Sequence, residues 1–244
     1  DGFYSSMKES HKYNASDFAY LDSLGYDFNP SLLDCRADAD VNPHAPICIG
    51  MDYNANINWI VAGQEQDNRL NVIKSFYVKF ERKIPAIIQD FCEYYRNHRC
   101  KQVIFYYDST ALGSNYAVNK QDFKYVIEAE FKKHGWRIKS VYLGHPMRHN
   151  EKYLLINEGF AGKRRLTPFF NVDNNEALLI AIQSAGVMRG RNGFSKHKAG
   201  EKLAESEENL LEHRTDGTDA FDTLYIGMNN KPVKVSSVSV YGVG

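Results

Sequence analysis

Aspartates occupy three places in this sequence where carboxylates could act on a phosphodiester: Asp52, Asp108, and the pair Asp216 and Asp219. Carboxylates that lie together repel one another, so their ionised form needs a compensating cation. Ligands that offer only oxygen favour hard ions such as Mg²⁺ or Mn²⁺. Two such ions about 3.5 to 4 Å apart activate a water molecule and stabilise the leaving oxygen of a phosphodiester. These residues therefore indicate hydrolysis with two divalent cations, provided that the fold brings them together.

Two of the three places are the ends of predicted β-strands. The apolar run 47–51 leads into Asp52, and the almost wholly apolar run 103–107, typical of a strand covered on both faces, stops at Asp108. Because open α/β sheets place their sites beyond the carboxyl ends of strands, these two aspartates are expected to lie together. Further strands are predicted at 57–62, 70–80 and 136–143.

The third place opens a predicted helix over residues 216–229. Asp216 and Asp219 are three residues apart and share one face of it, so both can point at one ion. Asp222 is turned about 120° from Asp216 and is a weaker candidate. Strands and helices in this order predict an α/β fold with a mixed β-sheet and helices on both faces. Apolar residues at spacings of three and four predict the other helices at 84–98, 121–134, 150–160 and 174–187.

Composition divides the chain into three parts. Residues 1–46 are rich in Asp, Ser, Asn and Pro and are expected to form an arm or linker. Residues 47–230 hold the α/β domain, and residues 231–244 are expected to be a tail, either disordered or added as an edge strand. Within the domain, residues 189–212 change from basic to acidic, which predicts an exposed loop.

Composition also excludes some classes of protein. No run of about 18 apolar residues could span a membrane. Thirty basic residues balance thirty acidic ones, so net charge gives no reason to expect a nucleic-acid partner. The four cysteines are widely spaced and lack a CxxC pair, so a reducing cytoplasm is expected. A zinc site at Cys35, His44 and Cys48 is not expected, because their spacing is not that of a zinc finger and a fourth ligand is missing. Because the chain opens on Asp1 rather than Met, it is expected to be a fragment of a longer protein.

Three short motifs carry a resemblance to a known family. They are IGMDY at 49–53, IFYYDS at 104–109 and TDGTDAFDTLY at 215–225. Together they resemble the C-terminal nuclease domain of phage terminase large subunits, over roughly residues 45–229. The resemblance implies an RNase H-like fold, related to that of Holliday-junction resolvases, and two-metal carboxylate chemistry. It implies an endonuclease that cuts concatemeric, double-stranded viral DNA during packaging.

The resemblance assigns roles to the acids residue by residue. Asp52 matches the metal ligand of the first strand, Asp108 the ligand of the central strand, and Asp219 the ligand that precedes Ala in the final motif. Asp216 matches a position that is often His or Asp and also lies at the metal. The implied setting is a phage or prophage protein in the bacterial cytoplasm. Its implied partners are a terminase ATPase domain, a portal and a small terminase subunit.

One part of the family's pattern is missing. Large terminases carry an ATPase motor with a GxxxxGK[ST] loop, and this sequence has none. Gly162 and Lys163 are followed by Arg164, and Asn157 stands where the first glycine would be. The sequence therefore predicts the nuclease half alone.

DNA binding would require basic residues near the acids, because phosphate neutralisation supplies most of the non-specific affinity. The predicted DNA contacts are Lys163, Arg164, Arg165, Arg191, Lys196 and Lys198. Basic residues of this kind are more commonly plain surface charges.

Two alternative functions stay open. A junction resolvase or transposase-like nuclease would use the same fold and chemistry on other DNA. A non-catalytic module that docks onto a portal or capsid would instead use the acids as turn and cap residues.

Overall fold

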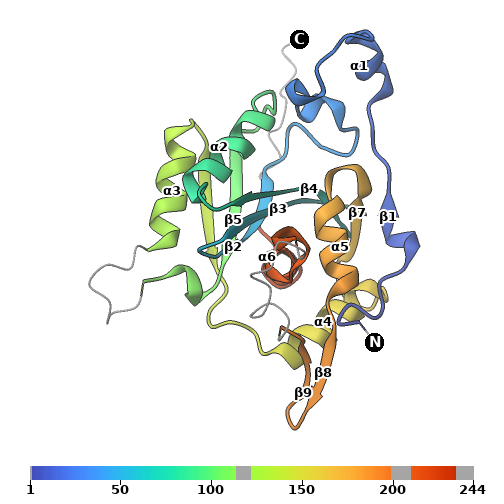
Figure 1. Ribbon diagram of the computed structural model, residues 1–244, viewed down its shortest axis with the longest axis vertical. Coiled ribbons are helices and arrows are strands. Elements are labelled where there is room, and N and C mark those ends of the chain that lie inside the picture. Colours follow the sequence, from blue (N-terminus) through green and yellow to red (C-terminus); the bar gives the residue numbers. More distant parts are fainter. Residues whose placement is uncertain (1, 114–121, 199–209, 235–244) are drawn as a thin grey trace, which may run out of the picture.

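A seven-stranded β-sheet forms the centre of the molecule and carries helices on both faces (Figure 1). The structure is a computed structural model, and it describes residues 2–113, 122–198 and 210–234. One strand, β3, runs antiparallel to both of its neighbours, and the other neighbouring pairs in this sheet are parallel. The mixed sheet predicted from the sequence is confirmed. In spatial order its strands are β1 (Lys12–Tyr13), β7 (Thr167–Asn171), β4 (Arg69–Lys79), β3 (Ile57–Gln66), β2 (Ile47–Tyr53), β5 (Gln102–Tyr107) and β6 (Arg137–Tyr142).

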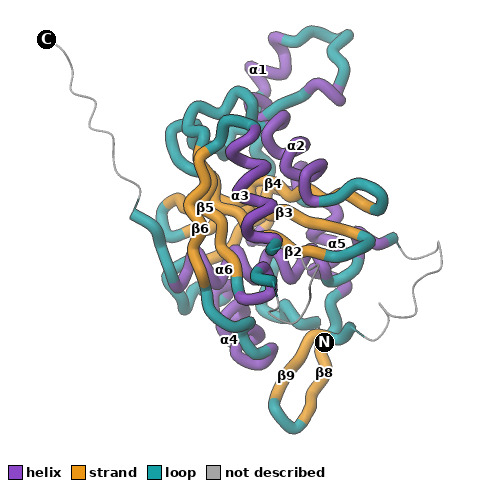
Figure 2. The backbone as a smooth tube through the Cα atoms, turned by 90° about the vertical axis from the view of Figure 1, so that its left-hand side faces the viewer, coloured by secondary structure: helices purple, strands orange, loops and turns teal. Residues whose placement is uncertain are grey.

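The helices enclose one apolar core on each face of the sheet (Figures 1 and 2). Helices α2 (Ile84–Tyr94) and α3 (Phe123–Lys133) cover one face. Side chains alternate along a strand, and β2 accordingly sends Ile47 and Ile49 to this core and Cys48 to the other. The opposite face is covered by α4 (His149–Phe160), α5 (Glu176–Ser184) and α6 (Asp216–Asn230).

Residues 2–46 pack against the body of the molecule at both ends, whereas the middle of the segment, around residues 18–32, is largely exposed. Strand β1 pairs with β7 at the sheet edge, and a short helix, α1 (Phe18–Ser23), follows it. Phe3 and Tyr4 are buried in the core beneath α6. The surfaces that receive the start of this segment come from residues about 150 positions later in the chain, so local composition gave no sign of the packing.

The predicted loop at 189–212 begins with a β-hairpin. Its strands β8 (Val187–Gly190) and β9 (Gly193–Lys196) project from the sheet near α4 (Figure 1). The helix predicted at 174–187 accordingly ends earlier, at Ser184. The basic residues of this stretch hid the strand alternation from the sequence pattern. Residues 199–209, and residues 235–244 of the predicted tail, lie outside the described part of the chain.

Two further features concern the cysteines and the lengths of the helices. None of the four cysteines is in a disulfide. Among the described helices, none is both long enough and apolar enough to cross a membrane.

Candidate active site

The ends of β2 and β5 bring two of the predicted acids to one edge of the sheet. These strands are parallel neighbours, with Gly50 opposite Tyr106. Asp52 and Asp108 each follow two residues after that pair, so they occupy equivalent positions. Along each strand the even-numbered side chains face α6, as Cys48 and Tyr106 do in the core on that side. Both aspartates therefore stand on the face that α6 covers.

Helix α6 lies very close to β2 because two glycines permit it. A Cβ atom at Gly50 would overlap the carbonyl oxygen of Ala220 and lie 2.8 Å from the backbone nitrogen of Leu224. A Cβ atom at Gly217 would lie 2.9 Å from the Trp59 ring. This approach sets the first turns of α6, with Asp216 and Asp219, over the end of β2 that carries Asp52.

Asp52 has no compensating partner. Its carboxylate makes no hydrogen bond or ion pair with any described residue. Burial, and then the charges of Asp219 and Asp216, raise its pKa to about 8, although Lys198 and Lys196 oppose the shift. This shift has the two causes expected of a carboxylate held among other carboxylates. Asp52, Asp216 and Asp219 therefore belong to one electrostatic centre.

Asp219 has two compensating partners, both from the segment at and just after β9. The Lys196 ammonium lies 2.6 Å from Oδ1, and the Lys198 ammonium pairs with Oδ2. Burial would raise the pKa of Asp219, but the charges of Lys196, Lys198 and Lys152 outweigh it and hold the pKa well below its usual range. Lys198 is 40% exposed at its side chain, whereas Lys196 is 0% exposed.

Lys196, one of the predicted DNA contacts, is enclosed in this structure between acidic side chains. Its ammonium lies 2.6 Å from Asp222 Oδ2 and donates to Thr218 Oγ1 at 3.0 Å. Tyr4 donates to the other oxygen of Asp222 at 2.7 Å. Burial disfavours a charged lysine, yet Asp222, Tyr4 and Asp219 raise the pKa of Lys196 well above its usual value. A side chain enclosed in this way cannot reach DNA in this conformation.

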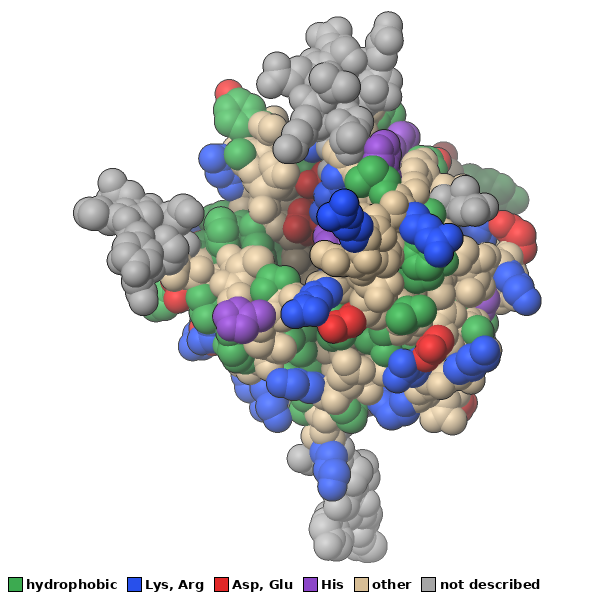
Figure 3. Space-filling view, turned by 90° about the horizontal axis from the view of Figure 1, so that it is seen from below, with side chains coloured by type: hydrophobic (Ala, Val, Ile, Leu, Met, Phe, Trp, Pro, Cys, Tyr) green, Lys and Arg blue, Asp and Glu red, His purple; other side chains and the backbone are tan. Residues whose placement is uncertain are grey.

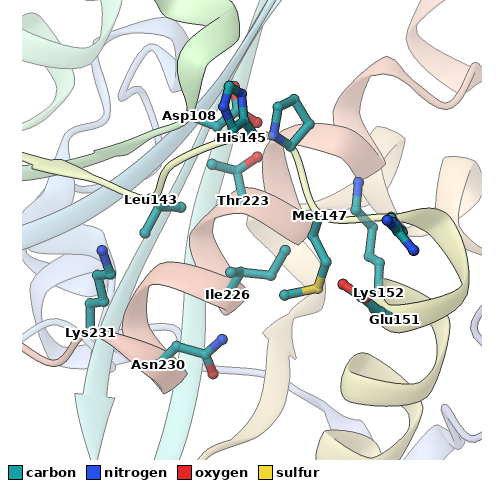
Figure 4. Close-up of a pocket in the computed structure, with 12 residues that line it drawn as sticks. Asp108, Leu143, His145, Met147, Glu151, Lys152, Thr223, Ile226, Asn230 and Lys231 are labelled. Carbon is teal, nitrogen blue, oxygen red and sulfur yellow. The ribbon is translucent and has the colours of Figure 1, made fainter.

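Asp216 and Asp108 are each held by a neighbouring polar residue. Asn54, in the β2–β3 turn, donates to Asp216 Oδ1 at 3.0 Å, and Arg214 Nε lies 3.7 Å from Oδ2. Asp108 accepts hydrogen bonds from the backbone nitrogen and the hydroxyl of Thr110, and so caps a short 3₁₀ turn. Asp108 thus acts as a turn former here, and it also lines a cavity that opens beside it (Figure 4).

The donor atoms suit a divalent cation, but in the described conformation they are not gathered around one point. Carboxylate oxygens are the ligands that Mg²⁺ and Mn²⁺ prefer, and Asp52 lacks any other cation. Among residues 2–113, 122–198 and 210–234, however, no group of three or more His, Cys, Asp or Glu could hold an ion as it stands. In this conformation Lys196 and Lys198 occupy both oxygens of Asp219.

The other predicted DNA contacts are divided between two ends of the molecule. Arg165 binds the carbonyl oxygens of Met228 and Asn229 at the far end of α6, and Arg164 pairs with Glu158 at 2.7 Å. With Lys163 beside them, these residues lie away from the acids. Arg191 lies in the β8–β9 turn, and Lys198 lies at the site. In the space-filling view, acidic side chains line a hollow and basic side chains stand beside it (Figure 3).

Some site residues were missed by the sequence reasoning. Lys152, on α4, lies 3.7 Å from Asp222. The His149 ring accepts a hydrogen bond from the Lys196 backbone at 3.4 Å, and burial together with the nearby lysines lowers its pKa. Tyr4 and Asn54 complete the group. The sequence gave no signal for these residues, because His149 and Lys152 lie in an ordinary first helical turn, Asn54 in a turn and Tyr4 near the start of the chain.

Comparison with known proteins supports the fold. No family model and no curated protein matches the sequence. The large terminase of a thermophilic bacteriophage, solved with ATP-gamma-S, matches with a TM-score of 0.52 and 11% identity over 90% of this chain. That match covers 44% of the terminase, so this chain spans less than half of its length.

A second solved structure, the large terminase nuclease domain of bacteriophage SPP1 with bound Mn, matches with a TM-score of 0.44 and 14% identity. This match covers 75% of this chain and 86% of that domain. The likeness to the first of these structures shows the fold that the motifs indicated, a mixed sheet of the RNase H-like kind with helices on both faces.

Proposed function

We propose that this chain is the nuclease part of a phage large terminase, a two-metal-ion endonuclease that cuts double-stranded DNA during packaging. The observation that carries the proposal is the convergence of Asp52, from β2, with Asp216 and Asp219, from α6, in one electrostatic centre of this fold. Carboxylates held together without full compensation suit a cation-assisted reaction. A carboxylate used only as a turn former has no need of such neighbours.

The residues would divide the work of hydrolysis among them. Asp52 and Asp219 would hold the divalent cations, with Asp108 and Asp216 beside them. When bound, Mg²⁺ or Mn²⁺ ions would supply a water nucleophile of lowered pKa and charge for the leaving oxygen. Asn54 orients Asp216 through its 3.0 Å hydrogen bond. Asp52 loses its proton when a cation offsets the charge of its neighbours.

The two lysines would differ in role. Lys196 is enclosed and bridges Asp219 and Asp222, so it positions the α6 acids through the β8–β9 hairpin. Lys198 is partly exposed and can exchange Asp219 Oδ2 for a cation at little cost, because exposed ion pairs contribute about 0.2–1 kcal/mol. Once released, its ammonium is available to a DNA phosphate.

The wider setting of the proposal follows from the resemblance and from the length of the match. A terminase ATPase domain, a portal and a small terminase subunit would be partners of the intact protein in the bacterial cytoplasm. The ATPase domain would present the DNA to this nuclease. The nuclease itself would cut with little sequence preference.

A second candidate has one observation in its favour. Both oxygens of Asp219 are paired with lysines, as in a module whose ion pairs are purely structural. A non-catalytic docking module of this kind would neither bind metal nor cut DNA. A junction resolvase would cut, but it would prefer branched DNA to a linear duplex.

Cleavage of supercoiled plasmid in Mg²⁺, Mn²⁺ and EDTA tests the proposal. The matched variants are Asp52→Asn and, as a control, Asp67→Asn in the β3–β4 turn at the opposite end of the sheet. We expect metal-dependent nicking and linearisation by the chain and by Asp67→Asn, and none by Asp52→Asn. Cleavage that survives Asp52→Asn, or no cleavage and no metal binding by the chain, would contradict the proposal.

A further inference from the structure

A cavity of about 310 Å³ opens beside Asp108, between the loop after β6, the start of α4 and one side of α6 (Figure 4). Nothing in the proposed metal chemistry uses it. It nevertheless adjoins the acids directly. Thr223 lines it and donates to the carbonyl oxygen of Asp219, one turn earlier on α6. Any strand that crosses Asp108 and Asp219 therefore passes the mouth of this cavity.

One part of the cavity is apolar. Leu143 follows β6, Met147 precedes α4 and Ile226 lies on α6, and all three are only partly buried. Their side chains converge in the middle of the close-up (Figure 4). Flexible and branched apolar side chains of this kind can pack against the flat face of a nucleobase.

The remaining lining is polar and mainly basic. His145 and Arg148 are exposed and make no side-chain hydrogen bond or ion pair with any described residue. Lys231 donates to the Tyr142 carbonyl oxygen at 2.8 Å, which holds a lysine ammonium at the far end. Glu151 also lines the cavity, yet the lysines and arginine of the lining outnumber its acids. The lining thus combines an apolar patch for a base with cations for a phosphate.

The size of the cavity limits its occupant. Sites for small organic ligands begin at about 300 Å³, so 310 Å³ admits one nucleotide but not a base pair. An enzyme that admits a single base must take it from an unpaired position or extrude it from the duplex. Extrusion costs a few kcal/mol and costs least where the base is already unpaired.

We propose that this cavity binds one unpaired nucleotide of the DNA strand that is cut, next to the scissile phosphate. Its base lies against Leu143, Met147 and Ile226, and its phosphate lies toward Arg148 and His145. The assignment rests on the proposed function, because the carboxylates define where the scissile phosphate lies. It narrows the substrate to DNA that is gapped, frayed or flipped at the cut site.

The test measures binding in EDTA, where no cleavage occurs. Fluorescence anisotropy would compare a duplex that carries one unpaired 2-aminopurine with the fully paired duplex. We expect the chain to favour the unpaired form by about tenfold, and the 2-aminopurine emission to change on binding. Ile226→Glu should abolish the preference, taken as the ratio of the affinities of the same variant for the two duplexes, and the emission change. Ile226→Asn, which adds no charge, should reduce both.

The control is Ile180→Glu, which makes the same change in a different groove, between α5 and β4. It should leave the preference intact. Equal affinity of the chain for both duplexes, or the same preference in Ile226→Glu as in Ile180→Glu, would overturn the assignment. Plasmid cleavage is measured separately. A chain that cuts plasmid but does not prefer the unpaired duplex would therefore refute only the assignment of the cavity as a nucleotide site. An inactive chain with an Ile226-dependent preference refutes the proposed nuclease and the placement beside a scissile phosphate, and leaves nucleotide binding in the cavity.

Discussion

Asp52 and Asp219 belong to one acidic centre, yet their pKa values are shifted in opposite directions. Asp52, at the end of β2, forms no ion pair with a described residue, and burial beside other carboxylates raises its pKa to about 8. Asp219, on α6, is held by Lys196 and Lys198, and its pKa lies well below the usual range. The segment at and just after β9 therefore supplies positive charge to Asp219 on α6, whereas Asp52 on β2 still needs a cation.

The largest effect expected from this comparison is on stability. Lys196→Met would leave Asp219 and Asp222 buried without their shared cation, and breaking a buried pair costs about 3–5 kcal/mol. Lys198→Met removes the same charge from a partly exposed position and should cost less than about 1 kcal/mol. Urea denaturation of both variants checks the difference. Equal losses would show that the two lysines have the same role.

Stability of the metal-free chain should also separate the two aspartates. Asp52→Asn removes an uncompensated charge and should raise the free energy of unfolding by about 1 kcal/mol at pH 8. Asp219→Asn should lower it, because two lysines lose their partner. Thermal melts in EDTA measure both. A loss of stability in Asp52→Asn at pH 8 would mean that Asp52 has a partner after all.

The pH dependence of these effects has opposite signs. The folded pKa of Asp52 is raised, so its contribution to stability is present below about pH 4 and is lost as pH rises toward 8. The stability gained by Asp52→Asn should therefore grow between pH 4 and 8. The folded pKa of Asp219 is lowered, so its contribution is present above about pH 4 and is lost in acid. Thermal melts of each variant and the unchanged chain at several pH values measure the stability difference. A difference that does not change with pH, or that changes in the opposite sense, would contradict the direction of the pKa shift.

A smaller effect is expected on metal affinity. Lys198→Met removes a competing cation from Asp219 Oδ2, and a partly exposed pair of this kind corresponds to a gain of up to about fivefold in Mn²⁺ affinity. Isothermal titration calorimetry would measure it, with Lys8→Met, an exposed lysine elsewhere, as the control. Weaker Mn²⁺ binding in Lys198→Met would show that this lysine supports the metal site rather than competing with it.

The smallest effect is expected at the far end of α6. Lys163→Ala should change DNA affinity and its salt dependence by less than about twofold, because this residue lies with Arg165 beyond Met228 and away from the acids. Lys198→Ala should reduce both by more. DNA binding measured at two salt concentrations tests the contrast, and equal losses would extend the DNA surface along the whole helix.

The sequence predicted five of the seven strands of the central sheet because their apolar runs are local signals, and it missed β1 and β7. Asp52, Asp108 and the Asp216–Asp219 turn could be placed in this way, since each lies where such a run ends or a helix begins. The compensation of charge could not be predicted, because Lys196 reaches Asp222 across 26 positions and Tyr4 reaches it across 218. For the same reason the sequence left open how residues 2–46 pack, since Ser6 and Asn157 meet across 151 positions.

The central claim is that the centre around Asp52 is a site for divalent cations. Titration of the chain with Mn²⁺ at pH 7, in two buffers that differ in ionisation enthalpy, tests it most directly. The account predicts saturable binding that releases a proton from Asp52, and at least tenfold weaker binding without proton release in Asp52→Asn. Absent binding, or binding that is unchanged in Asp52→Asn, would contradict it.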